Sequence, residues 1–296
     1  MVKTKFGILI IVMTLFVLVS SVLAEPTAIY EIQYTADPNG DSPLNGMLVN
    51  ECSGGIVTCV FLGTRARIVV QDSNYPDGWG AIQVKDIDQM GYLDDIKVGD
   101  YVRIFNVTVE EFRGTTFLQM IAEDEPAIIV VSRNNPVPEP LVVDVNEIAA
   151  PVYEPGSGGY FVADHGAEKY EAMLIRIEDV FVTDVNLGKE SDNYVLQDND
   201  NTGDPNFSCW ASDYLNNDRE DGHLYHPYVK LNQRFCSVTG ILEQYTRLSQ
   251  DWDYYQLLTT YSGDLKRYTP ADISGDCMVD FRDFAMFCEY WLWGTE

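Results

Sequence analysis

The sequence predicts an all-β protein, made of two small β-barrels in tandem and followed by a short loop and helix at the C-terminus. Residues 28–268 alternate apolar and polar side chains, with Gly, Asn and Asp at short intervals, which is typical of a barrel or sandwich. A first block of strands is repeated by a second block in the same order. No long helical period occurs before Pro270.

The N-terminus has the pattern of a secretory signal peptide. Lys3 and Lys5 precede the apolar run that starts at Phe6, and small residues lead to a cleavage site after Ala24. The alternative is an uncleaved membrane anchor, because the run is near the length needed to span a bilayer. We therefore predict that residues 1–24 are a signal peptide, that the mature chain is secreted/extracellular or at the cell surface, and that it has no transmembrane segment after cleavage.

Residues 25–135 predict the first barrel. The expected strands are MLVNECSGGIVTCVFL, RIVVQD, GWGAIQVKD, KVGDYVRIFNVTVEEF and TTFLQM, and the last two are joined by Arg113-Gly114. Residues 136–165 are rich in Pro and then in Gly, which indicates a linker with at most a short helical turn in VDVNEIAA.

Residues 166–269 predict the second barrel. AMLIRIEDVFVT repeats the start of the first block, YVLQD repeats IVVQD, and VKLNQRFCSVTGILEQYTRL repeats the Gly-Asp strand and its hairpin. An internal repeat of this length indicates two copies of one small unit. The second copy has Asn232-Gln233 where the first has Gly-Asp.

Both blocks resemble OB-fold-like modules of secreted bacterial proteins. The matching residues of the first copy are Gly46, Val49, Gln71, Asp72, Gly99, Asp100, Val102 and Gly114. The resemblance implies binding of an oligosaccharide or oligonucleotide on one sheet face. Trp79, Trp252, Tyr254 and Tyr255 are the candidates for stacking on such a ligand. The alternative is that these rings fill cores.

The stretch DISGDCMVDFRD predicts a Ca²⁺ site, because it places oxygen donors at alternate positions before a helix. Counted from Asp272, the candidate metal ligands are Asp272, Ser274, Asp276, the Met278 carbonyl, Asp280 and Asp283. Asp280 could bind directly or through water. The alternative is an acidic turn in which Asp280 only caps the helix.

This stretch resembles the calcium loop of a dockerin and the terminal segments of exported planctomycete proteins. The resemblance implies a cohesin-like partner or a cell-surface component. Two departures are a single repeat instead of two, and Cys277 at the position where Gly is usual. The following helix is apolar nearly all round, so it must be covered either by its own barrel or by another protein.

Six cysteines in an exported chain indicate disulfides. They fall into sequence-local pairs, and we expect the bonds Cys52–Cys59, Cys209–Cys236 and Cys277–Cys288. About fifteen pairings are possible for six cysteines, so the order along the chain is the only guide.

The formal charge of −27 disfavours nucleic acid as a partner, because phosphates require a basic surface. His223 and His226 lie near Asp218 and Asp221, but a third convincing metal ligand is absent. No nucleophile, phosphate-loop or zinc-protease motif occurs. The sequence therefore predicts an exported, non-catalytic binding or scaffolding protein, not an enzyme. One alternative is an extracellular hydrolase or nuclease whose catalytic site has no recognisable motif. Another is an accessory protein of such an enzyme, which binds oligosaccharide or nucleic acid through its OB-like barrels.

Overall fold

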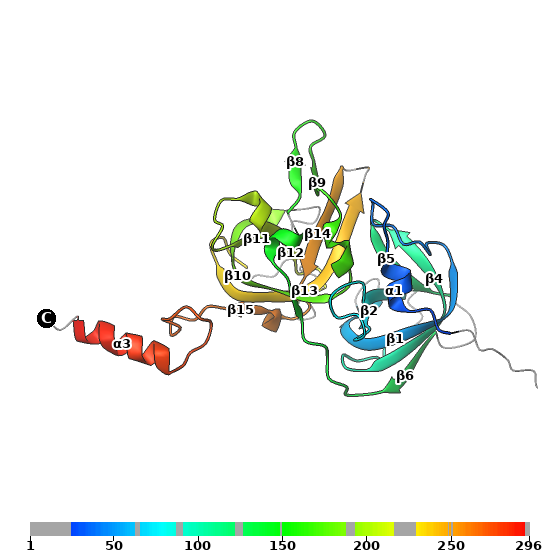
Figure 1. The fold of residues 1–296 in the computed structure, drawn as a ribbon, viewed down its shortest axis with the longest axis horizontal. Coiled ribbons are helices and arrows are strands. Elements are labelled where there is room, and N and C mark those ends of the chain that lie inside the picture. Colours follow the sequence, from blue (N-terminus) through cyan, green and yellow to red (C-terminus); the bar gives the residue numbers. More distant parts are fainter. Residues whose placement is uncertain are drawn as a thin grey trace, which may run out of the picture.

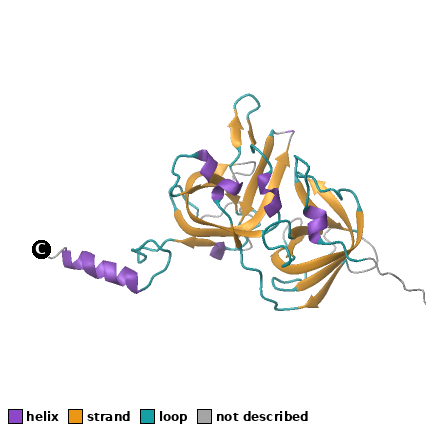
Figure 2. Cartoon of the chain, viewed as in Figure 1, coloured by secondary structure: helices purple, strands orange, loops and turns teal. Residues whose placement is uncertain are grey.

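The computed structural model describes residues 25–62, 66–86, 91–121, 127–148, 150–187, 193–215, 229–247, 249 and 251–293. The predicted signal peptide, and the pair His223 and His226, lie outside these ranges. Two β-barrels lie side by side, and a C-terminal helix projects away from them (Figures 1 and 2). The prediction of an all-β, OB-like fold with a short C-terminal helix is confirmed. None of the helices in the described ranges has the length and hydrophobicity that a membrane span requires.

The first barrel closes in the order β1-β2-β3-β5-β4, because β4 also pairs with β1. β3 and β5 run parallel, the other neighbours are antiparallel, and β6 extends the edge at β4. A short helix, α1, packs beside β3. The elements are α1 (Ile29–Gln33), β1 (Leu48–Phe61), β2 (Ala66–Gln71), β3 (Ala81–Asp86), β4 (Tyr101–Phe112), β5 (Thr115–Met120) and β6 (Ile128–Ser132).

The second barrel has the same topology. Its order is β10-β11-β12-β14-β13, closed by the pairing of β13 with β10, and β12 and β14 form the parallel pair. β15 extends the edge at β13, as β6 does at β4. The internal duplication is therefore confirmed. The strands are β10 (Leu174–Leu187), β11 (Asn193–Asp198), β12 (Ser208–Ser212), β13 (Arg234–Arg247), β14 (Trp252–Leu258) and β15 (Leu265–Arg267).

The two copies share their turns as well as their strands. Gly46 and Ala172 precede the first strand of their barrels, and both have positive φ. The N–H of each residue donates to a carbonyl of the fourth strand over 2.8 Å, Gly46 to Val109 O and Ala172 to Leu242 O. Gly99 and Asn232 likewise both adopt positive φ before that fourth strand. Asn tolerates this conformation, so the turn is kept although the residue differs.

The segment between the barrels carries structure of its own. It contains β7 (Leu141–Val142), α2 (Val145–Ile148), β8 (Val152–Glu154), β9 (Gly159–Phe161) and the 3₁₀ helix η1 (Gly166–Tyr170). β7 pairs with β10 and β9 pairs with β14, so this segment is part of the second barrel's sheet. The short helical turn predicted in VDVNEIAA is α2.

Cysteine pairing differs from the prediction. The disulfide joins Cys236, on β13, to Cys277, in the terminal loop. Cys52, Cys59 and Cys209 are buried free thiols, and Cys288 is a partly exposed one. The expected sequence-local bonds are therefore wrong. The reason is that Cys59 and Cys209 point into apolar clusters, whereas barrel topology brings β13 next to the chain that follows β15.

Candidate functional site

The terminal loop gathers carboxylates in front of the helix α3 (Phe281–Trp293). One oxygen from each of Asp272, Asp276 and Asp283 lies within 4.8 Å of the others. Carboxylate oxygens are the donors that a hard cation such as Ca²⁺ prefers. The first, fifth and twelfth positions of the predicted site are thus brought together by the fold.

Backbone N–H groups hold two of these carboxylates in place. Asp272 accepts from the N–H groups of Gly275 (2.9 Å) and Cys277 (2.8 Å). Asp283 accepts from those of Asp280 (2.7 Å) and Ser274 (2.9 Å). These two bonds lower the pKa of Asp283 to about 2, so it is ionised at neutral pH. The donor set therefore fits a divalent cation, because its carboxylate oxygens are held in place by hydrogen bonds and retain further lone pairs.

The other predicted ligands are placed differently. Ser274 Oγ lies 3.4 Å from Asp272 Oδ1, at the edge of the cluster. Met278 donates its N–H to Asp276 Oδ1 over 3.0 Å, and its side chain is exposed. Asp280 accepts the N–H of Arg282 over 2.7 Å and so caps α3. Its carboxylate lies outside the three-residue cluster.

Cys277 occupies the position where Gly was expected, and its φ is 65°. This conformation favours Gly because a Cβ makes it strained. The disulfide to Cys236 anchors this residue to the second barrel. The loop therefore has covalent support at its least favourable backbone position, although from β13 and not from Cys288.

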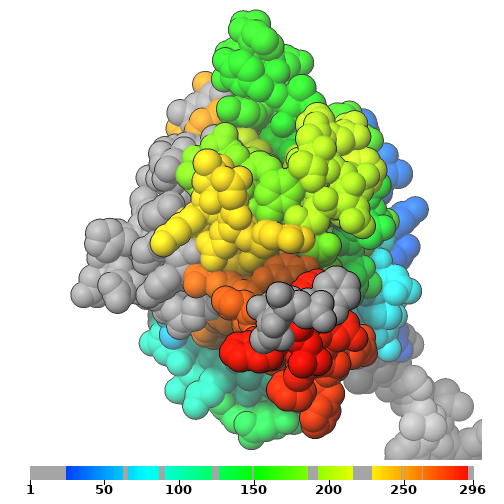
Figure 3. Space-filling model, turned by 90° about the vertical axis from the view of Figure 1, so that its left-hand side faces the viewer, coloured from blue at the N-terminus to red at the C-terminus, as the bar shows by residue number. Residues whose placement is uncertain are grey.

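α3 exposes apolar side chains on every side. Phe281 is 89% exposed, and Tyr290, Trp291 and Leu292 are each 66% exposed. Phe284 and Phe287 are exposed as well. Figure 3 looks at the molecule from the side of this helix, which stands clear of the barrels in Figure 1. Neither barrel covers the helix. The alternative that its own barrel would bury it is therefore not met in this structure.

The first barrel's usual OB ligand face is occupied by the second barrel. OB-folds bind oligonucleotides and oligosaccharides on the face of their second and third strands. Here the outward residues of β2 and β3 include Arg67 and Gln83, and both contact Glu243 on β13, at 3.0 and 3.1 Å. Val69 and Ala81 join the second barrel's apolar cluster. No ligand can reach this face while the barrels stay packed.

The second barrel's corresponding face is covered by its own chain. Trp210, on β12, is 3% exposed because Tyr160 on β9 and Tyr254 on β14 pack against it, with ring centroids 4.9 and 4.6 Å away. Gln197, on β11, bonds to three carbonyls of the loop that follows it. In the described residues both OB faces are therefore closed.

The aromatic candidates separate into two groups. Tyr255 is fully buried and Tyr254 is 3% exposed, so the alternative that these rings fill cores is confirmed for both. Trp252 is half-buried beside Tyr254. Trp79 is half-buried at the surface, with its ring against that of Tyr34 (centroids 5.5 Å apart). Its φ of 62° is unusual for a bulky residue and costs about 1–3 kcal/mol.

Acidic side chains are buried where the barrels meet, which composition alone did not indicate. Thr116, on β5, donates its N–H to Glu171 (3.0 Å) and its hydroxyl to Glu111. Burial raises the pKa of Glu111 to about 7 and that of Glu168 to about 8. Burial, together with repulsion from Glu168 and Glu111, raises the pKa of Glu171 well above its usual range. At a pH between the usual carboxyl pKa and these raised values, the three glutamates are protonated whereas exposed carboxyl groups are ionised.

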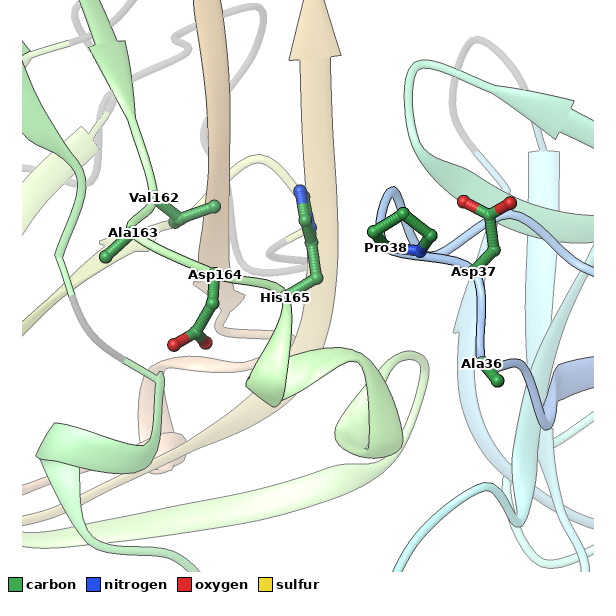
Figure 4. A pocket seen from close by; sticks show the side chains of 7 residues that line it. All are labelled: Ala36, Asp37, Pro38, Val162, Ala163, Asp164 and His165. Atoms are coloured by element: carbon green, nitrogen blue, oxygen red, sulfur yellow. The ribbon is translucent and has the colours of Figure 1, made fainter.

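A hydrogen-bonded chain leads from these carboxyls to a cavity. The Tyr255 hydroxyl donates to Glu168 over 2.7 Å and lies 3.0 Å from His165 Nδ1, while His165 Nε2 lies 3.3 Å from Asp253. His165 lines a cavity of about 450 Å³ (Figure 4). One wall is formed by residues 36–38, after α1, and the other by residues 162–165, after β9.

The fold and the terminal site define a tandem OB-like barrel protein with a C-terminal acidic loop and helix. No family model matches the chain, and no curated protein matches it either. Among solved structures, one described as the crystal structure of fission yeast Pot1 and ssDNA aligns with a TM-score of 0.29 and 10% identity. That alignment covers 81% of this chain and 88% of the other. A likeness this weak carries no argument about function.

Proposed function

We propose that this protein is an exported, non-catalytic scaffolding protein whose calcium-organised C-terminal module docks on another protein. The observation that carries the proposal is the combination found in residues 272–293. Three carboxylates converge in front of a helix whose apolar side chains are exposed. Exposed apolar patches of this kind mark protein interaction sites.

The role of the ion follows from charge. Asp272, Asp276 and Asp283 repel one another when all are ionised, and Arg282 offsets only part of this through its contact with Asp276 at 2.9 Å. A bound Ca²⁺ would supply the missing positive charge and would fix the loop against the first turn of α3. The residues that would hold it are these three aspartates, with Ser274, Asp280 and the Met278 carbonyl as further predicted donors.

The partner we propose is a cohesin-like domain with an apolar docking surface. α3 offers Phe284, Trp291 and Leu292 along one stripe, and large aromatic side chains are enriched at the energetic centres of protein interfaces. The module is held to β13 by the disulfide, so a docked partner would be connected firmly to the barrels.

Calcium binding is tested on the mature full chain with two variants, Asp276→Ala and Asp283→Ala. We expect millimolar Ca²⁺ to raise the Tm of the wild-type protein and EGTA to reverse the rise, because an ion that binds only the folded state stabilises it. Both variants should lose this response. Asp200→Ala, which changes an exposed acid on the second barrel, is the matched control and should keep it. Calorimetry that detects no Ca²⁺ binding at millimolar concentration would refute the proposed site.

Docking is tested with immobilised cohesin-type domains and the full chain. Binding should require Ca²⁺ and should be lost in Trp291→Ser, which removes an exposed ring and leaves the loop unchanged. Binding that persists in both EGTA and the Trp291→Ser variant would show that the partner uses another surface.

A further inference from the structure

Four aromatic rings form a continuous row on the surface of the first barrel. Tyr30 stacks on Tyr34, with centroids 5.1 Å apart and planes at 18°, and also on Tyr75, at 4.7 Å and 16°. The rings of Trp79 and Tyr34 make a T-shaped contact, with centroids 5.5 Å apart and planes at 71°. Tyr34 is 48% exposed and the other rings are half-buried. We call these four residues the aromatic platform.

The positive φ of Trp79 indicates that the turn does not need a Trp side chain, and that the ring has a role other than folding. With φ of 62°, position 79 has a backbone conformation that Gly adopts with less strain than Trp. Both neighbouring residues, 78 and 80, are Gly. The contact that holds this conformation is the hydrogen bond from the N–H of Trp79 to Lys169 O, at 2.6 Å, which any residue could make. A bulky ring at such a position is therefore not required by the turn, and strained residues gather at binding sites.

The platform is joined through the chain to one wall of the cavity between the barrels. Tyr34 is followed by residues 36–38, which form one wall, and Figure 4 shows Asp37 and Pro38 on this side, opposite His165. The cavity of about 450 Å³ falls within the range of about 300–1,000 Å³ that small-molecule sites occupy. His165 cannot turn freely because Asp253 and Tyr255 hold its two nitrogens. The wall on that side is thus fixed before any ligand arrives.

Charge selects the class of ligand. Exposed acids flank the platform and the cavity: Glu31, Asp37, Asp77 and Asp164. The whole chain carries −27. Carboxylates repel phosphate and uronate groups but accept hydrogen bonds from hydroxyls. The electron-rich face of an aromatic ring attracts the C–H groups on the flat side of a sugar ring.

We propose that the aromatic platform and the adjoining cavity bind a neutral oligosaccharide. A sugar ring stacks on Trp79 and contacts the exposed part of Tyr34, whose one face is covered by Tyr30. Sugar hydroxyl groups donate to Asp37 and Asp164 in the cavity. The site lies on α1 and on the connection between β2 and β3, away from the covered OB faces. It does not depend on the terminal module, so its binding should be unchanged by EGTA.

The experiment is affinity electrophoresis of the full chain through gels that contain a soluble polysaccharide. The neutral probes are mixed-linkage β-glucan, galactomannan and dextran, and the anionic probes are polygalacturonate and single-stranded oligo(dT). We expect retardation by at least one neutral probe, with or without EGTA, and none by the anionic probes. The proposal would be overturned if no neutral probe retarded the protein. It would also be overturned if oligo(dT) retarded the wild-type protein but not the Trp79→Gly variant.

The variants separate binding from folding. Trp79→Gly removes the ring, keeps the N–H that bonds to Lys169 and relieves the positive φ, while it loses the contact with Tyr34. It should therefore fold with a Tm close to that of wild type and yet lose at least tenfold in affinity. Tyr34→Ala should weaken binding similarly. Tyr153→Ala, which removes an exposed ring on β8 outside the platform, should bind like wild type. Equal retardation of Trp79→Gly and wild type would refute the role of the platform.

Discussion

The burial of single thiols decides how the six cysteines behave. Cys52, Cys59 and Cys209 are all 0% exposed, and burial raises the pKa of Cys52 to about 11 and those of the other two to about 12. A thiol reacts as the thiolate, so these three are both inaccessible and protonated at neutral pH. Cys288, on α3, is neither fully buried nor bonded.

We predict that a thiol reagent labels one cysteine rapidly in the native protein at pH 8, and that this residue is Cys288. After unfolding without reductant, the four free cysteines should react. Mass spectrometry of the labelled peptides provides the measurement, and Cys288→Ser is the control that removes the fast phase. Three disulfides and no free thiol would contradict the structure.

At the scale of the element, one turn is built twice from different residues. Gly46 and Ala172 hold equivalent positive-φ positions, and a Cβ at Gly46 would meet nothing within 4 Å. A substitution at Gly46 therefore changes only the backbone energy. For Ala172, this conformation costs about 1–2 kcal/mol relative to the right-handed region.

We predict that Gly46→Ala lowers the free energy of unfolding by about 1 kcal/mol, because the left-handed strain exceeds the entropy gained by restricting the unfolded chain. Ala172→Gly relieves the same strain but also removes a methyl that is fully buried in the second barrel's cluster, so the two effects should nearly cancel and the free energy of unfolding should change by less than about 1 kcal/mol. Urea denaturation measures both. A stabilised Gly46→Ala protein would mean that this turn relaxes to negative φ.

The terminal helix and the duplication are elements that sequence alone could predict. The strand blocks carry local alternation, and the acidic loop carries its spacing in consecutive residues. The disulfide pairing could not be predicted, because Cys236 and Cys277 are 41 residues apart and meet only through the barrel topology. For the same reason the row formed by Tyr30, Tyr34, Tyr75 and Trp79 was missed: α1 and the connection between β2 and β3 are separate in sequence.

At the scale of the whole molecule, polar groups are buried between the barrels. Arg67 and Glu243 form an ion pair at 3.0 Å, and their side chains are only 5% and 9% exposed. Gln83 shares the same carboxylate. Breaking such a pair leaves an unpaired buried charge, whereas replacing both partners with apolar residues is often nearly neutral.

We predict that Glu243→Leu alone destabilises the protein by about 3–5 kcal/mol, and that adding Arg67→Met recovers most of the loss. Chemical denaturation of the two single variants and the double variant gives the coupling free energy. Additive effects would indicate that Arg67 and Glu243 do not interact in the folded protein.

The buried carboxyls at the junction predict an unusual response to pH. The pKa values of Glu111, Glu168 and Glu171 are higher in the folded protein than in the unfolded chain, so between about pH 4.5 and pH 8 the folded state binds more protons. Stability must then fall as pH rises through this window, by up to about 1.4 kcal/mol per pH unit for each such group.

We expect the Tm to be higher at pH 5 than at pH 8. Glu171→Gln, which keeps an acceptor for the N–H of Thr116 but cannot ionise, should reduce the difference. Glu289→Gln on the exposed face of α3 is the control for the overall loss of one negative charge. A Tm that rises between pH 5 and pH 8 would show that these carboxyls are ionised in the folded protein.

The bond between Cys236 and Cys277 also determines how mechanical tension would travel through the molecule. A pull on α3 enters the barrel at β13, which is paired with β10, β14 and β15. The chain between the two cysteines, including β14 and β15, lies inside the covalent loop and bears no load. A force applied to α3 would therefore be opposed by the hydrogen bonds that β13 makes with three neighbouring strands.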